Sequence, residues 1–228
     1  MDDYKIIEKN ILFEDNHLLA VKKECGILSQ PDQTGGKDLF NLCKNYIKIK
    51  YEKPGNVYVG LLHRLDLHVS GITLFAKTSK AAKRVADMFQ SRDVKKFYNA
   101  VVENSVEPAE DRLQDQIKKD EKTRTAFSSE DGADAELAYR LLKKGFCHST
   151  PVSLLEIELF TGRFHQIRFQ FSSRGYPVLG DKKYGSKEKA DHKCIYLHAS
   201  KLIFQHPITK EELTIECPHP AKWNKFFS

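Results

Sequence analysis

The order of apolar and polar positions along the chain predicts short strands interrupted by a few helices. Residues 11–23 (ILFEDNHLLAVKK) read as two strands around an Asp-Asn turn, and residues 95–103 (KKFYNAVVE) alternate as a strand does. Residues 37–53 and 78–92 place apolar side chains near helical spacing, and Thr78 is a favourable residue for capping the second of these helices. The first half therefore predicts two helices set among strands.

The polar segment at residues 61–71 (LLHRLDLHVSG) separates two further predicted strands, at residues 56–61 and 72–77. Between residues 103 and 134 apolar residues become rare and both charge signs mix, which predicts a peripheral excursion with mobile loops and no domain boundary.

Strand patterns resume after this excursion. Residues 135–144, 152–160, 194–207 and 212–217 all read as strands, whereas residues 161–175 fit either a helix or an irregular strand, and a short aromatic helix is expected at the end. Because strands outnumber helices without regular βαβ alternation, we expect an α+β fold with a mixed, largely antiparallel central sheet and flanking helices. Residues 1–228 are expected to form a single domain.

Composition narrows the function classes only modestly. The 228 residues are 40% hydrophobic and 30% charged, as in ordinary globular proteins, and apolar runs stay well short of the roughly 20 residues that cross a bilayer. The start, MDDYKIIEKN, does not resemble a secretory signal, so a cytoplasmic protein is expected. With 37 Lys and Arg against 31 Asp and Glu, the net charge of +6 is compatible with a polyanionic partner.

Common cofactor motifs are missing from the sequence. The segment TGGKD near residue 36 suggests a phosphate loop, but Pro31 stands where the first glycine belongs and Asp38 replaces the Ser or Thr that would hold magnesium. The nine histidines follow neither His-Glu-x-x-His nor a zinc-finger spacing. No metal and no small-molecule cofactor are therefore expected.

Two segments concentrate polar residues in apolar surroundings. The first is residues 61–71, and the second is residues 161–185 (TGRFHQIRFQFSSRGYPVLGDKKYG). An arginine within an apolar run is costly to bury unless a carboxylate pairs with it, and Asp66 of the first segment is a natural candidate for such a pair. A buried Arg–Asp pair that only joins two segments is the structural alternative, but the additional Arg, His, Gln and Gly residues exceed what such a tie needs.

These two segments, together with KKFYNAVV, resemble the RluA-type RNA pseudouridine synthases, and so do ILFEDNHLLAV near the start and YLHASKLIFQHP near the end. The resemblance extends over almost the whole chain in the order of the family. It implies the pseudouridine synthase fold with a catalytic cleft. It also implies that specific uridines of ribosomal or transfer RNA are detached from their ribose, turned and rejoined through carbon, without any cofactor. A monomer that contacts no membrane is expected.

The resemblance also assigns residues. Asp66 matches the catalytic aspartate, Tyr98 the active-site tyrosine, and Arg168 the arginine that pairs with the aspartate. The target uridine must be flipped into the site, where the ring of Tyr98 offers a stacking surface. Further RNA contacts are expected from Arg64, His63, Arg163, His165 and Gln166, although His63 fits a loop-shaping role better and His68 has no assignment.

The chain departs from the family pattern at four positions that concern loop geometry or substrate choice: Lys22, Glu24, Val69 and Leu137. The small RNA-binding domain that often precedes the catalytic domain is also expected to be missing, because the match begins by residue 11.

Two other function classes stay open at this point. One is an RNA-binding or chaperoning protein that keeps the fold without catalysis, and the other is a metal-dependent hydrolase that uses His63, His68 and Asp66. Replacing Asp66 separates the first of these from an enzyme, and exhaustive chelation separates the second.

Overall fold

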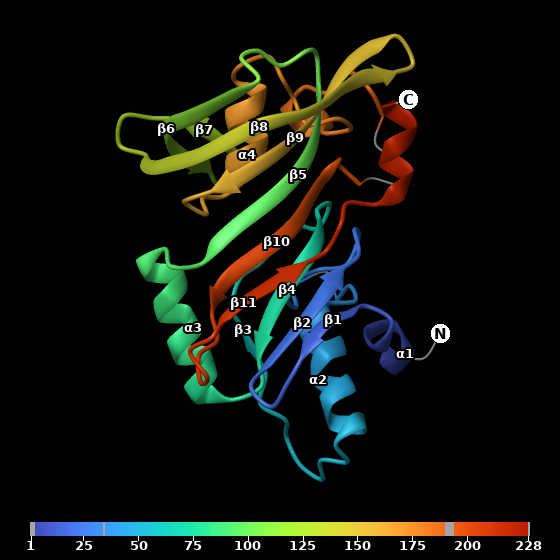
Figure 1. Ribbon diagram of the computed structural model, residues 1–228, viewed down its shortest axis with the longest axis vertical. Helices are drawn as coiled ribbons and strands as arrows, with labels where there is room; N and C mark the ends of the chain where they lie inside the picture. Colours follow the sequence, from blue (N-terminus) through green and yellow to red (C-terminus); the bar gives the residue numbers. More distant parts are fainter. Residues whose placement is uncertain (1–2, 34, 190–193, 228) are drawn as a thin grey trace. The chain divides into compact units, whose positions relative to one another are not determined.

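The computed structural model describes residues 3–33, 35–189 and 194–227, which fold as two compact units (Figure 1). Unit 1 comprises residues 1–94 and 200–218, and unit 2 comprises residues 95–199 and 219–228. Within the described ranges, no helix is long and apolar enough to cross a membrane.

Unit 1 contains short strands with helices packed against them. Its elements are α1 (Asp3–Glu8), β1 (Ile11–Glu14), β2 (Leu18–Lys23), α2 (Leu39–Lys50), β3 (Gly60–Leu61), β4 (Ser70–Ala76), α3 (Ser79–Ser91) and β11 (Glu212–Glu216), with the end of β10 (Leu197–Gln205). The strand order is β1-β2-β4-β10, with β3 on β4 and β11 on β10. The pairs β1–β2, β2–β4, β3–β4 and β10–β11 are antiparallel.

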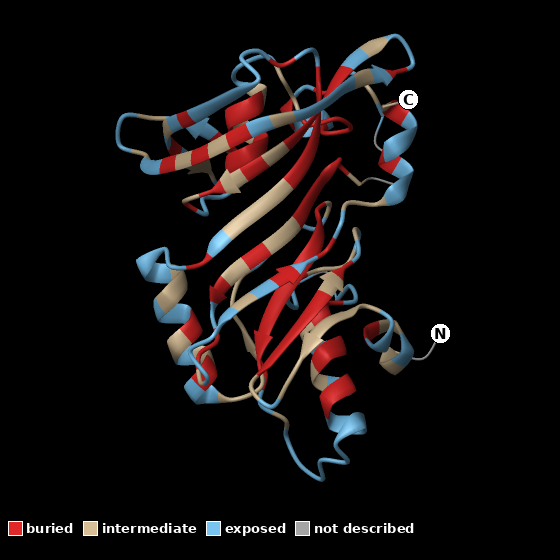
Figure 2. Cartoon of the chain, viewed as in Figure 1, coloured by how far each residue is buried: buried red, intermediate tan, exposed pale blue. Residues whose placement is uncertain are grey.

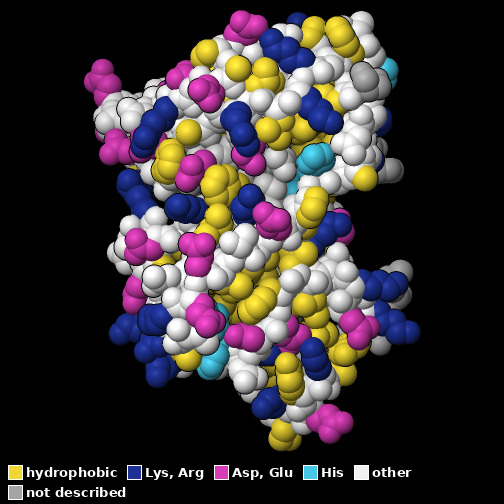
Figure 3. All heavy atoms as spheres, in the orientation of Figure 1, with side chains coloured by type: hydrophobic (Ala, Val, Ile, Leu, Met, Phe, Trp, Pro, Cys, Tyr) yellow, Lys and Arg dark blue, Asp and Glu magenta, His cyan; other side chains and the backbone are white. Residues whose placement is uncertain are grey.

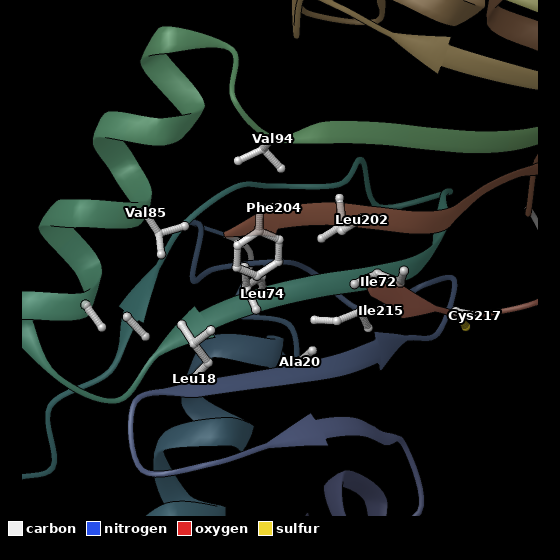
Figure 4. Packing of buried hydrophobic residues seen from close by; sticks show 12 residues of the cluster. Leu18, Ala20, Ile72, Leu74, Val85, Val94, Leu202, Phe204, Ile215 and Cys217 are labelled. Atoms are coloured by element: carbon white, nitrogen blue, oxygen red, sulfur yellow. The ribbon is translucent and has the colours of Figure 1, made fainter. Parts of the chain in front are cut away.

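Strands β2 and β4 are buried on both faces, because a helix packs against each face. Leu18 and Ala20 of β2 join the hydrophobic cluster of α3 that Figure 4 shows, which includes Val85. Their neighbours in β2 join a second cluster that contains Tyr46 of α2. Alternate residues of one strand thus fill two cores, which explains why the strand sequence is almost continuously apolar.

Both predicted helices of unit 1 begin at a capping side chain. The carboxylate of Asp38 accepts from Asn41 N at 2.8 Å at the start of α2, and Thr78 Oγ1 accepts from Ala81 N at 3.2 Å at the start of α3. The helices expected at residues 37–53 and 78–92 are confirmed. The strand expected at residues 56–61 is wrong for most of its length, since only Gly60 and Leu61 pair.

Unit 2 is an antiparallel sheet in the order β5-β9-β8-β6-β7. Its elements are β5 (Lys95–Glu103), β6 (Glu110–Asp120), β7 (Thr125–Ser128), β8 (Ala133–Cys147), β9 (Thr150–Leu159), α4 (Gln166–Ser172) and the 3₁₀ helices η1 (Lys182–Tyr184) and η2 (Ala221–Phe226), with the start of β10.

Mobile loops were expected at residues 103–134, and this is wrong, since the segment contains strands β6 and β7; its peripheral place holds, because these strands end the sheet order. Along β8, Ala135, Leu137 and Tyr139 are buried and alternate with less buried residues, a pattern that Figure 2 shows. Only Leu113 and Ile117 of β6 are buried, so a strand with one covered face shows few apolar residues. The ambiguous segment at residues 161–175 contains helix α4, and the α+β class is confirmed.

Candidate active site

Asp66 lies in the loop that leads into β4, and a network of hydrogen bonds fixes the backbone on either side of it. Ser29 Oγ donates to Leu65 O at 2.8 Å and accepts from Leu65 N at 3.0 Å, so one buried hydroxyl satisfies both backbone groups of the preceding residue. Leu67 O, after Asp66, accepts from Gly26 N at 2.8 Å. We name residues 23–29 the loop clamp, because they hold this loop.

Lys23 is the second donor to Leu67 O. Its ammonium is buried and donates to Ile27 O at 2.8 Å, Glu24 O at 3.2 Å and Leu67 O at 3.3 Å. Burial lowers the pKa of Lys23 to about 8, while the negative charges of Asp66 and Glu24 act in the opposite direction. Lys23 is therefore mostly charged at neutral pH and places a cation under the loop that carries Asp66.

The loop clamp depends on Gly26, whose backbone has φ of +85°. This left-handed conformation favours glycine, and here it presents the amide N–H to Leu67 O. The turn after Asp66 closes with Val69 N donating to Asp66 O at 3.1 Å. Asp66 is half-buried, so a backbone fixed by hydrogen bonds carries a residue that is still partly exposed.

The other residues of the first polar segment differ in their surroundings. His63 Nε2 accepts from Leu74 N of β4 at 3.1 Å, and the imidazole lies 5.3 Å from the ring of Phe89 on α3. These contacts support a loop-shaping role for His63 and occupy one of its two ring nitrogens. Arg64 is exposed, as an RNA contact requires, and its role stays a prediction.

Arg168 is buried in unit 2 against a carboxylate of the same polar segment. Its Nε and Nη2 donate to the two oxygens of Asp181 at 2.6 and 2.9 Å, and its guanidinium lies 4.9 Å from the ring centre of Tyr184. A bidentate pair stacked on a ring holds the guanidinium plane in one orientation. The pairing of Arg168 with Asp66, which the resemblance implies, stays a prediction.

Gln166 is a structural link at the start of α4. Its carbonyl oxygen accepts from Thr161 Oγ1 and from Arg163 N, and its amide nitrogen donates to Glu136 O and to Gln170 Oε1. These four bonds use the capacity of a buried amide group, which supports a positioning role over the expected RNA contact.

Three further candidate site residues of unit 2 differ in how far they are buried. His165 adopts φ of 50°, its Nδ1 lies 2.9 Å from Tyr184 Oη, and its ring stacks on Phe164. The exposed side chain of Arg163 donates to Asp134 O at 2.9 Å. Tyr98 is half-buried on β5 opposite Ile157 of β9.

The sequence interpretation missed Lys23 and Ser29 of the loop clamp, although a lysine that ends the apolar run LLAVKK was a visible signal. The structure also shows where the four residues that depart from the family pattern lie. Lys22 and Glu24 form an ion pair of 2.8 Å with each other, whereas Val69 and Leu137 are buried.

The chain is similar to a known protein family and to several of its members. The family model described as RNA pseudouridylate synthase matches residues 17–173. A ribosomal large subunit pseudouridine synthase D of Zymomonas mobilis is 31% identical over 237 residues, covering 97% of this chain and 72% of the relative. A tRNA pseudouridine synthase C of Vibrio parahaemolyticus is 30% identical, with 97% and 95% covered.

The fold is also shared with a solved structure. Human RNA pseudouridylate synthase domain containing 4 superimposes with a TM-score of 0.78 at 22% identity, covering 96% of this chain and 92% of that one. At 22% sequence identity, this similarity establishes a shared fold and nothing further.

Proposed function

This chain belongs to the RNA pseudouridylate synthase family, and we propose that it isomerises specific uridines of ribosomal or transfer RNA with Asp66 as its catalytic residue. The observation that carries the assignment of Asp66 is the loop clamp. Both neighbours of Asp66 are hydrogen-bonded to residues 23–29, while Asp66 itself is only half-buried. A catalytic group needs this combination of a fixed backbone and an accessible side chain.

The reaction breaks the bond between N1 of uracil and the ribose and forms a bond from C5 of the turned base to the same ribose carbon. No atom is gained or lost overall, so the protein has to supply a group that handles charge and protons at the ribose. The carboxylate of Asp66 can attack the ribose, attack the base or remove a ribose proton, and all three routes require its ionised form.

The remaining candidates keep the supporting roles that the family resemblance implies for them. The half-buried ring of Tyr98 provides a stacking surface for the flipped base, a contact worth about 1–3 kcal/mol. The exposed, cationic Arg64 binds phosphate or fills the gap that the flipped base leaves. Arg168, held by Asp181, supplies positive charge in a fixed orientation. That the enzyme is cytoplasmic and monomeric stays a prediction.

The direct test replaces Asp66 with Asn, which removes the charge and keeps the size. We expect pseudouridine formation in ribosomal and transfer RNA to fall by at least about 10²–10⁴-fold, because Asn neither accepts a proton nor attacks carbon at a useful rate. Base-resolved pseudouridine mapping of RNA from a strain that lacks the protein, with and without added enzyme, measures this and also identifies the uridine.

Asp87→Asn is the matched control, because Asp87 is an exposed aspartate of α3 in the same unit. This variant should retain full activity. Turnover by folded Asp66→Asn at the rate of the control would refute the assignment of Asp66. Loss of modification without loss of the cellular phenotype would favour the RNA-binding alternative.

A further inference from the structure

Three potential metal ligands converge in unit 2, outside the residues to which the proposed function assigns a role. They are Cys147 at the end of β8, His148 in the following turn, and Glu188 after η1. In the described part of the chain, their donor atoms form a group in which all three lie within 4.8 Å of one another.

Nδ1 of His148 lies close to both other ligand atoms of this group. Cys147 Sγ lies 3.7 Å from His148 Nδ1, and Glu188 Oε2 lies 3.3 Å from the same Nδ1. A Cys–His–Glu relay of the kind found in nucleophilic enzymes would use both imidazole nitrogens, one for the thiol and one for the carboxylate. The geometry therefore does not fit a relay, and one proton on Nδ1 cannot bond both neighbours at full strength.

Two of the three distances fit edges of a tetrahedron around a zinc ion, and the third, between Cys147 Sγ and a carboxylate oxygen of Glu188, is within 4.8 Å. Zinc bonds of about 2.0–2.1 Å to nitrogen, 2.0–2.2 Å to oxygen and 2.3 Å to sulfur separate N from O by roughly 3.3–3.5 Å and S from N by roughly 3.5–3.6 Å. The distances of 3.3 and 3.7 Å match these edges closely.

Hydrogen bonds to residues outside the cluster fix the position of Glu188. The buried carboxylate of Glu103 accepts from the backbone N–H groups of Lys187 and Glu188, both at 3.0 Å, which fixes the loop that carries Glu188. Thr150 Oγ1 donates to Glu188 Oε1 at 2.7 Å and leaves Oε2 directed at His148. Outer partners of this kind orient ligands in known metal sites.

We propose that Cys147, His148 and Glu188 bind one Zn²⁺, which joins the turn between β8 and β9 to the loop after η1. The thiolate and imidazole favour zinc over Mg²⁺ and Ca²⁺, which prefer oxygen ligands. Three protein ligands leave the fourth position to water. The exposed ring of His148 gives the ion a path from solvent, since its side chain is 82% exposed.

The experiment titrates the purified full chain, first stripped of metal with a chelator, with Zn²⁺ and separately with Co²⁺. We expect one tightly bound zinc per chain, a thiolate-to-cobalt charge-transfer band, and no competition from Mg²⁺. Cys147→Ser, His148→Asn and Glu188→Gln should each weaken zinc binding at least about tenfold. Asn is chosen because it tolerates the positive φ of His148, which is 54°.

Cys217→Ser and Glu156→Gln are the matched controls, since they change a buried cysteine and a paired carboxylate elsewhere. They should bind zinc as the parent chain does. All five variants should retain uridine isomerisation, so this test is independent of the role of Asp66. Absence of zinc binding, or binding of equal strength in the folded His148→Asn and Glu188→Gln variants, would overturn the proposal.

Discussion

At the residue scale, the most informative feature is that the loop carrying Asp66 is held through its backbone. Ser29 binds both backbone groups of Leu65, while Lys23 and Gly26 bind the carbonyl of Leu67. None of these contacts uses the carboxylate of Asp66. The loop clamp can therefore fix the position of the carboxylate without blocking it.

Ser29→Ala tests this positioning. The substitution leaves a buried N–H and a buried C=O of Leu65 without Ser29 Oγ, at a cost of about 1–3 kcal/mol in the free energy of unfolding. We also expect kcat for uridine isomerisation to fall about tenfold or more while KM changes little, because the defect concerns the placement of Asp66. Urea unfolding and steady-state kinetics measure the two effects.

Ser91→Ala is the control for this prediction, because Ser91 is an exposed serine at the end of α3. It should leave kcat unchanged. A Ser29→Ala enzyme that is destabilised yet turns over at the parent rate would show that the loop clamp serves stability alone.

At the scale of elements, β1, α2 and the end of β4 are joined by one carboxylate. Glu14 at the end of β1 accepts from Lys50 and Tyr46 of α2, from Tyr51, and from Lys77 after β4, at 2.7–3.0 Å. Burial raises the pKa of Glu14, but these four hydrogen bonds outweigh burial and lower the pKa to about 2. The network binds elements that are far apart in sequence.

This network predicts an acid-dependent loss of stability. Because the pKa of Glu14 is lower in the folded state than its ordinary value of 4.5, its contribution is complete above pH 4.5 and is lost as the pH falls toward 2. Glu14→Gln should lower the free energy of unfolding at pH 7 by about 1–2 kcal/mol, after allowance for solvent screening. The difference between the two proteins should shrink between pH 4.5 and pH 2.

Denaturant unfolding of both proteins across this pH range measures the effect. Glu156→Gln is the control, because the ion pair of Glu156 with Arg140 is more exposed than the ion pairs of Glu14 with Lys50 and Lys77. A constant stability difference between the Glu14→Gln and parent proteins from pH 7 to pH 2 would contradict the network interpretation.

At the scale of the whole molecule, the charge excess is modest and its signs are interspersed. The chain carries 37 Lys and Arg against 31 Asp and Glu, and the face in Figure 3 shows basic and acidic side chains mixed over the surface. Attraction to RNA then depends on local phosphate contacts more than on a strong overall field. Such contacts still release counterions from the RNA.

RNA affinity should therefore fall as salt rises. With three or more phosphate contacts, the dissociation constant should increase at least about tenfold between 50 and 200 mM KCl. Fluorescence anisotropy with the Asp66→Asn protein and labelled transfer RNA or ribosomal RNA fragments measures binding without turnover. An affinity that does not change over this range would argue against phosphate contacts and against a polyanionic substrate.

The sequence alone determined the family and most of the elements, because these depend on local order. Apolar periodicity predicted α2 and α3, and the spacing of polar residues around Asp66, Tyr98 and Arg168 carried the resemblance that the family comparison confirmed. Strands β6 and β7 were missed because a strand covered on one face needs few apolar residues.

Tertiary structure decided which distant residues meet. Ser29 and Leu65 are 36 residues apart, Arg168 and Asp181 are 13 apart, and His148 and Glu188 are 40 apart. No local pattern predicts these contacts, since each depends on how strands pair and loops return. The sequence therefore identified Asp66 as a candidate catalytic residue, and the fold revealed the backbone contacts that hold its loop and, separately, the convergence of Cys147, His148 and Glu188.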